Sequence, residues 1–326
     1  MEKEYNARGL VLACVGGLYR CLLDDDGEAL GGKEVFCVAR GVLRHREERP
    51  MVGDRVEVSY TDRSFLVNGD GSVTPSENGT DIAVTGVIER RNSLIRPPLA
   101  NIDHMLVFLS AKAPVTLPSL ADKLIAICEH NKIEPVIVIS KSDLDESIAK
   151  GLYDTYSRAG FPTFLISSMS GEGIEELKEE LSGRMQGGRI AACSGVSGAG
   201  KSTLINRLCP TLELDTFSVS KKTERGRHTT RAVTLYPFLG GYLADTPGFS
   251  LLDFERFDFF DKDDLPYTFR EFEEYFGECR YADCTHTKEE GCAVLGAVRS
   301  GRIAKSRHES YIELYNILKM KPSWKK

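Results

Sequence analysis

The sequence feature that most constrains the fold is a glycine-rich segment, residues 195–202, which fits the pattern G-x-x-x-x-G-K-S. It follows an apolar segment that ends at Cys193 and precedes a helical pattern from Ser202 to Leu208. In this order, backbone N–H groups converge on phosphate oxygens at the N-terminus of the helix, Lys201 reaches the β and γ phosphates, and the Ser202 hydroxyl binds Mg²⁺. The predicted phosphate-binding residues are Gly195, Val196, Ser197, Gly198, Ala199, Gly200, Lys201, Ser202 and Thr203.

After about residue 100, short apolar segments alternate with segments of helical periodicity. Nearly continuous apolar strands separated by helices are typical of a parallel sheet that is covered on both faces. Ligands of such sheets bind at the carboxyl ends of the strands, which is where the glycine-rich segment lies. The expected strands are residues 105–109, 135–139, 162–166 and 189–193, and the expected helices include 120–131, 174–181 and 202–208.

A second phosphate segment, Asp-Thr-Pro-Gly at residues 245–248, follows an expected strand at 241–244. At the carboxyl end of that strand, Asp245 is placed to hold the Mg²⁺ shell, and the N–H group of Gly248 is placed to sense a γ-phosphate. Two such segments in one chain predict a nucleoside triphosphate hydrolase more strongly than either alone.

Base identity needs a further element, since the phosphate loop does not distinguish ATP from GTP. Residues 140–143, Ser-Lys-Ser-Asp, resemble the N/T-K-x-D guanine motif, with Ser140 as a shorter replacement for Asn. Residues 167–169 end the next strand in the position of the S-A-K element of GTPases. A backbone N–H group there would contact guanine O6. Both motifs precede the phosphate loop, which indicates a circular permutation. The predicted base-binding residues are Ser140, Lys141, Asp143, Ser167 and Ser168.

The polar segment 226–230 lies between the two phosphate segments. A switch threonine that closes over the metal is expected there, and Thr229 or Thr230 could serve; a mobile polar loop is the alternative. Ras-like enzymes orient the attacking water with a glutamine after the second phosphate segment, but this chain has Phe249. Our hypothesis is that His228 takes this role. The alternative is a solvated or RNA-facing histidine.

Near the C-terminus, three cysteines and one histidine follow the pattern C-x4-C-x-H-x5-C. Three thiolates and an imidazole suit tetrahedral Zn²⁺ in a closed, structural site. Disulfides are the rival interpretation, but the interposed histidine and an otherwise scattered set of single cysteines argue against them. The predicted zinc ligands are Cys279, Cys284, His286 and Cys292.

Residues from about 8 to 90 contain short β segments at 10–15, 35–40 and 55–60, separated by glycine- and aspartate-rich turns. This pattern predicts a small antiparallel barrel. The five-stranded oligonucleotide-binding type is one candidate, and the pattern does not separate it from other small barrels.

The chain carries a net charge of −6, which by itself argues against a nucleic-acid partner. Basic side chains nevertheless gather at residues 221–231 and 299–326. Such clusters either bind nucleic acid or form solvated surface. No apolar run approaches the roughly 20 residues that a membrane span requires.

Together these motifs resemble those of one family, the circularly permuted, ribosome small-subunit-dependent GTPases of bacteria (RsgA/YjeQ-like). The resemblance covers essentially the whole chain and includes two further segments, 52–56 and 100–103. The chain departs from the family pattern at Ser140, where the family usually has Asn, and mildly at Met169.

The resemblance implies a multidomain α/β protein with an oligonucleotide-binding-type β-barrel, a circularly permuted P-loop GTPase domain and a zinc-finger domain with helices. The implied cofactors are GTP/GDP, Mg²⁺ and one structural Zn²⁺. The implied function is late maturation of the small (30S) ribosomal subunit, with binding to its 16S rRNA and subunit-stimulated hydrolysis. The expected domains are residues 1–88 (RNA-binding barrel), 89–252 (GTPase) and 253–326 (zinc-binding, with a basic C-terminal helix).

We expect a cytoplasmic monomer without a membrane partner. An RNA-binding assembly scaffold with incidental hydrolysis is the alternative function, and an ATP-using P-loop enzyme is a third interpretation.

Overall fold

The computed structural model describes residues 3–41, 43, 49–68, 73–75, 82–95, 97–114, 117–210, 233–245 and 260–320. The chain forms two compact units. Unit 1 comprises Met1–Ile102, Gly187–Ile190 and Glu224–Pro247, and unit 2 comprises Asp103–Gln186, Ala191–Thr223 and Gly248–Lys326. The domain boundaries expected after residues 88 and 252 remain predictions. None of the described helices is both long enough and apolar enough to cross a membrane.

Unit 1 contains a closed five-stranded barrel, which confirms the barrel expected from the N-terminal sequence. Its strands are β1 (Glu4–Val15), β2 (Leu18–Leu23), β3 (Glu34–Ala39), β4 (Arg55–Thr61) and β7 (Ala83–Val87). The first half of β1 pairs with β4 and the second half with β2, so this long strand closes the circle β1-β2-β3-β7-β4. The pairing of β3 with β7 is parallel and the others are antiparallel. Inward side chains such as Val11, Cys21 and Val56 are fully buried.

Two segments of the family resemblance, one around Gly53 and one around Asn101, meet in unit 1. Gly53 has a φ of 87°, and a Cβ at this position would lie 2.1 Å from the carbonyl oxygen of Ala100, so only glycine fits. The Asn101 side chain donates to the Gly53 carbonyl at 2.9 Å. The buried Asp54 carboxylate accepts two hydrogen bonds from Arg90, at 2.7 and 2.8 Å. These residues therefore have a structural role, because they bind neighbouring segments of unit 1 to one another.

The other described strands of unit 1 form three antiparallel hairpins. One of them joins the barrel, because Thr234 pairs with Ala13 of β1. The hairpins are β5 (Phe65–Val67) with β6 (Val73–Pro75), β8 (Ser93–Ile95) with β9 (Pro98–Ala100), and β14 (Thr234–Phe238) with β15 (Gly241–Asp245).

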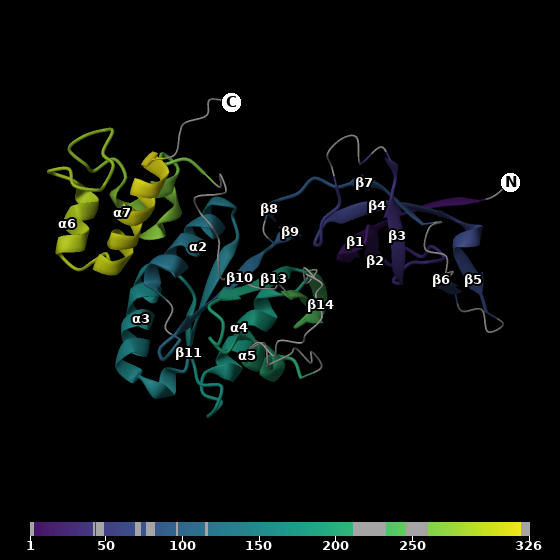
Figure 1. The fold of residues 1–326 in the computed structure, drawn as a ribbon, viewed down its shortest axis with the longest axis horizontal. Coiled ribbons are helices and arrows are strands. Elements are labelled where there is room, and N and C mark those ends of the chain that lie inside the picture. Colours follow the sequence, from purple (N-terminus) through teal and green to yellow (C-terminus); the bar gives the residue numbers. More distant parts are fainter. Residues whose placement is uncertain are drawn as a thin grey trace, which may run out of the picture. The chain divides into compact units, whose positions relative to one another are not determined.

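Unit 2 is built on a parallel sheet, as the alternation of strands and helices predicted, with the order β12-β11-β10-β13. Its strands are β10 (His104–Ser110), β11 (Glu134–Ser140), β12 (Thr163–Ile166) and β13 (Ile190–Gly195). Its helices are α2 (Pro118–His130), α3 (Glu146–Arg158), α4 (Ile174–Arg184) and α5 (Lys201–Leu208), and a short 3₁₀ turn, η2 (Ser142–Leu144), follows β11 (Figure 1). Ser110 pairs with Ser140 and Phe108 with Gly195, so these strands end at one edge of the sheet.

Residues 260–320, here called the C-terminal lobe, also belong to unit 2. The lobe has an aromatic core in which Phe269, Phe272 and Tyr311 are buried, with ring centroids 4.9 to 5.3 Å apart. Its elements are η3 (Leu265–Thr268), η4 (Arg270–Tyr275), α6 (Ala293–Arg299) and α7 (Lys305–Met320).

Buried charges join the C-terminal lobe to α2. The Arg307 side chain on α7 is 1% exposed and donates to Asp122 of α2 and to Glu271, in each case at 2.7 Å. Arg270 pairs with Glu129 of α2 at 2.6 Å. Charges at this depth are stable only when paired, so these contacts fix the lobe on α2. Arg307 belongs to the basic run 299–326, for which nucleic-acid binding or solvated surface was expected. Either role requires exposure, whereas the structure places Arg307 in the interior.

Candidate functional site

The glycine-rich segment forms a loop between β13 and α5, at the carboxyl edge of the unit 2 sheet. Gly195, Gly198 and Gly200 have φ values of 153°, 79° and 85°, which L side chains rarely adopt. A Cβ on Gly195 would also lie 2.7 Å from the Cβ of Phe108. The glycines are therefore required by both backbone angle and space.

Lys201 is the first residue of α5, and its side chain crosses the loop. Its Nζ donates to the carbonyl oxygens of Gly195 at 2.7 Å and Val196 at 2.9 Å. An ammonium group carries three protons, so one remains for a ligand. Burial lowers the pKa of Lys201, and the neighbouring Cys193 thiol opposes this shift. The protein itself thus holds the lysine in position across the loop.

The helix after the loop is anchored by its apolar face. Leu204, Ile205 and Leu208 are buried, whereas Ser202 is half-buried and Thr203 is exposed on the first turn. The first-turn N–H groups and the positive end of the helix dipole favour an anionic ligand at this end of α5.

The predicted base motif begins where β11 ends, and it lies beside the phosphate loop. A Cβ on Gly200 would lie 4.0 Å from the Cβ of Ser140, which is ordinary van der Waals contact. Lys141 follows in the left-handed conformation, with a φ of 58°. Asp143 is exposed in η2. Residues separated by 60 positions in the sequence are thus brought together by the parallel sheet.

The second base segment forms a closed loop after β12. Ser167 is fully buried, and its N–H group donates to the Glu172 carbonyl at 3.1 Å. That N–H group is therefore engaged within the protein. Of the predicted segment, Ser168 and Met169 remain as backbone donors to guanine O6. Met169 is 85% exposed.

The remaining phosphate-side predictions are only partly within the described residues. Asp245 is the last residue of β15 and is exposed, so it lies at the end of a strand as expected. The predicted residues that lie outside the described part of the chain are His228, Thr229, Thr230 and Gly248.

One segment at the carboxyl edge of the sheet was not among the predicted site residues. Residues 111–114 follow β10 and contact both Lys141 and Gly198. Their position directly after a buried parallel strand was the available signal, because ligands of such sheets bind at that edge. The segment carries no recognisable sequence motif.

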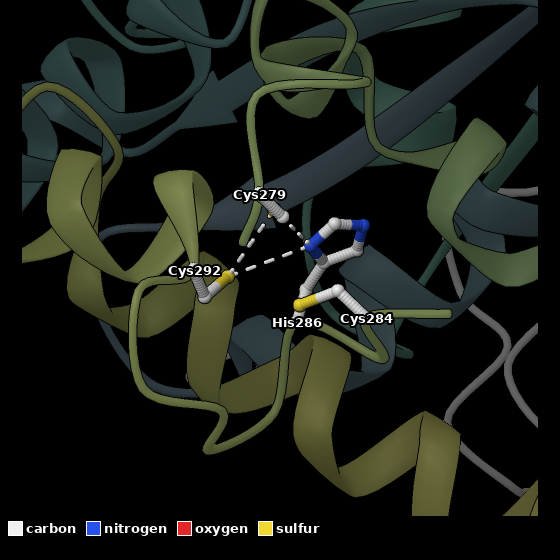
Figure 2. A group of neighbouring side chains, drawn as sticks. All are labelled: Cys279, Cys284, His286 and Cys292. Carbon is white, nitrogen blue, oxygen red and sulfur yellow. Dashed lines mark hydrogen bonds between the residues drawn. The ribbon is translucent and has the colours of Figure 1, made fainter. Parts of the chain in front are cut away.

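The predicted zinc ligands converge on one point in the C-terminal lobe (Figure 2). Their four ligand atoms lie within 4.8 Å of one another. The His286 Nδ1 atom is 3.6 Å from the Cys279 sulfur and 3.5 Å from the Cys292 sulfur, and these sulfurs are 3.9 Å apart. Around tetrahedral zinc, bond lengths of about 2.3 Å to sulfur and 2.0–2.1 Å to nitrogen place ligand atoms roughly 3.6 to 3.8 Å apart. The cluster is compatible with a zinc site.

Hydrogen bonds from α7 hold the backbone that carries these ligands. His308 Nε2 lies 2.8 Å from the His286 carbonyl oxygen, and the Tyr311 hydroxyl donates to the Thr285 carbonyl at 2.8 Å. His286 itself has a φ of 57°. These contacts fix an unusual backbone conformation and thereby orient the imidazole.

Residues 87–255 match the RsgA GTPase family, and residues 8–64 match the RsgA N-terminal domain. The small ribosomal subunit biogenesis GTPase RsgA of Geobacillus thermodenitrificans is 36% identical over 311 residues, covering 94% of this chain and 95% of that protein. The protein of the same name from Ruminiclostridium cellulolyticum is 36% identical over 324 residues, covering 97% and 95%.

Two solved structures are similar to this chain over nearly its full length. YjeQ from Thermotoga maritima has a TM-score of 0.74 and 30% identity, covering 98% of this chain and 100% of that chain. YloQ, described as a circularly permuted GTPase, has a TM-score of 0.72 and 29% identity, covering 98% of each chain.

The fold and the site define a circularly permuted P-loop GTPase with an N-terminal barrel and a Cys₃His cluster. The chain belongs to the RsgA GTPase family, which confirms the resemblance found in the sequence. It is an enzyme of the GTP hydrolase class.

Proposed function

We propose that this chain hydrolyses GTP to GDP and phosphate on the small (30S) ribosomal subunit, that the subunit stimulates this reaction, and that the chain acts in late maturation of the subunit. The observation that carries the proposal is the closeness of Ser140 to Gly200, where a Cβ would lie 4.0 Å from the Ser140 Cβ. It brings a guanine motif beside a phosphate loop that follows it in sequence. The names of the relatives supply the ribosomal context.

In this mechanism, the loop N–H groups and the Lys201 ammonium neutralise charge on the transferred phosphoryl group. Ser202, Asp245 and Thr229 or Thr230 would hold Mg²⁺, and all offer the oxygen donors that this ion prefers. Bound Mg²⁺ supplies further charge neutralisation at the β and γ phosphates.

The base and the γ-phosphate are recognised by separate groups. The Asp143 carboxylate accepts hydrogen bonds from guanine N1–H and N2–H₂, and the N–H group of Ser168 or Met169 donates to O6. The Gly248 N–H group contacts the γ-phosphate. His228 orients the attacking water.

Binding to 16S rRNA is assigned to the barrel and to exposed bases of the C-terminal lobe, where phosphate contacts supply the affinity. The lobe exposes Arg299, Arg302, Lys305 and Lys319, whereas Arg307 is engaged with Asp122. The cluster of three cysteines and His286 holds one structural Zn²⁺ that keeps the lobe folded. We further infer a cytoplasmic monomer that has no membrane partner.

GTP hydrolysis by the purified chain, measured with and without purified 30S subunits, tests this function. We expect slow turnover alone and clear stimulation by the subunit. Binding to the subunit without stimulation would favour the RNA-binding scaffold instead.

Substituting His228 by alanine is expected to lower subunit-stimulated hydrolysis about 100-fold, because positioned proton acceptors contribute at least that much to such reactions. GTP affinity should be unchanged. Single-turnover hydrolysis on the subunit and equilibrium nucleotide binding measure the two quantities. Unchanged turnover would eliminate the proposed role of His228.

Substituting Asp143 by alanine is expected to weaken GTP binding about 30- to 100-fold, because two hydrogen bonds to a carboxylate are lost. ATP binding should stay the same, since adenine does not present these donors. Competition between the two nucleotides measures the ratio of the GTP affinity to the ATP affinity. Glu146→Ala, which removes an exposed acid on the first turn of α3, is the matched control. Equal losses for both nucleotides would contradict guanine recognition by Asp143.

A further inference from the structure

The last residue of β10, Ser110, and the four residues that follow it are tied to the base motif at two points. The Ala111 N–H group donates to the Ser140 carbonyl at 3.0 Å, and the Lys141 Nζ donates to the Ala113 carbonyl at 2.7 Å. The left-handed conformation of Lys141 directs its backbone into η2, which carries the proposed guanine-binding aspartate. Residues 110–114 are here called the strut.

The far end of the strut touches the phosphate loop. A Cβ on Gly198 would lie 3.2 Å from Cγ and 3.4 Å from Cδ of Pro114, so the proline ring packs against the glycine backbone. Within the strut, the Ser110 hydroxyl donates to the Lys112 carbonyl at 2.6 Å. The strut therefore has an internal hydrogen bond that spans Ala111, the first of its residues attached to the base motif.

The base motif lacks the long side chain at its first position that could make this connection directly. The Ser140 hydroxyl donates to the Leu109 carbonyl at 3.1 Å. A hydroxyl has a single proton, so this bond leaves none for donation to the phosphate loop. A Cβ built on Gly200 would lie 4.0 Å from the Ser140 Cβ, so the Ser140 side chain is close to the loop only at van der Waals range.

We propose that the strut couples guanine recognition to the phosphate loop, with Lys141 and Pro114 as positioning residues. Lys141 holds the strut against the base motif, and Pro114 holds the loop at Gly198. The strut takes over a connection that a longer residue than Ser140 would make. This inference rests on the proposed function, because it assumes that GTP and GDP are the ligands of this site.

The test compares GDP and ADP affinities of the full, zinc-loaded chain and its variants, by competition with a fluorescent guanine nucleotide. Lys141→Met and Pro114→Ala should each weaken GDP about 10-fold and leave ADP within about two-fold, because only guanine engages the base motif. The double variant should be no weaker than the worse single variant, since both act through one segment. Lys141→Arg should restore most of the GDP affinity. Lys112→Ala, on the same segment, should bind GDP normally.

Equal losses of GDP and ADP in the variants would overturn the proposal, because they would show general damage to the site. Losses that multiply in the double variant would also overturn it, since the two residues would then act independently. A wild-type chain that binds GDP and ADP equally would overturn the proposed guanine specificity together with the strut. Zinc content and thermal unfolding of each variant must match the wild type, and Lys141→Arg serves as the folded reference for the other changes.

Discussion

Substituting Lys201 by alanine is expected to lower subunit-stimulated GTP hydrolysis roughly 100- to 1000-fold, the loss typical when one preorganised charge-stabilising group is removed. The reason lies in the geometry of the loop. Two carbonyl oxygens, those of Gly195 and Val196, hold the ammonium in place, so little reorganisation is needed when the phosphoryl group gains charge. Single-turnover hydrolysis at saturating GTP on the 30S subunit measures the effect apart from any loss of binding.

Lys150→Ala is the matched control, since Lys150 is an exposed lysine on α3. It should leave turnover within about two-fold of the wild type, as surface substitutions away from a site usually do. Hydrolysis by Lys201→Ala above a tenth of the wild-type rate would contradict the assigned role.

Substituting Cys284 by alanine is expected to weaken zinc binding by more than about 100-fold, since even the loss of an outer partner of a metal ligand costs about 10- to 100-fold. Cys284 is only half-buried, so its sulfur contributes little packing of its own. A large effect of this substitution would therefore come through the metal. Metal content of the purified chain, together with limited proteolysis within residues 260–320, measures the loss of zinc and of the folded lobe.

Cys14→Ser is the control for this experiment, because Cys14 is another half-buried thiol but lies on β1 of the barrel. It should keep the zinc content of the wild type. Full zinc content in Cys284→Ala, or no zinc in the wild-type chain, would contradict a zinc site formed by these four residues.

Much of the phosphate loop and of the zinc cluster could be predicted, because each is formed by residues that are close together in the sequence. The phosphate loop needs glycines at fixed spacing, and the structure shows positive φ values at Gly195, Gly198 and Gly200. The zinc pattern lies within 14 consecutive positions, from Cys279 to Cys292. Spacing alone was therefore enough to predict that its ligand atoms lie close together. The parallel sheet followed from continuous apolar strands, and its order agrees with the permutation inferred from the motifs.

Other features could not be predicted, because they depend on partners far away in the chain. Arg307 lies in the basic run for which nucleic-acid binding or solvated surface was expected, yet it pairs with Asp122, 185 positions earlier. Gly53 and Asn101 were noted only as parts of a resemblance, and the structure shows that they bond to each other. Two barrel strands, β2 and β7, were not among the predicted segments. Strand β7 is short and contains Gly86, a residue type that is rare in strands.

By itself, the sequence determined which chemical groups the chain possesses and the order in which they occur: a phosphate loop, guanine motifs upstream of it, and three cysteines with a histidine. These follow from backbone requirements and ligand chemistry over a few residues. Only the tertiary structure decided which groups meet. It placed Ser140 beside Gly200, seated Pro114 on Gly198 and buried Arg307 against α2. The physical reason is that local propensity acts over a few residues, whereas packing in a sheet and its covering helices selects contacts by shape and charge, regardless of distance along the chain.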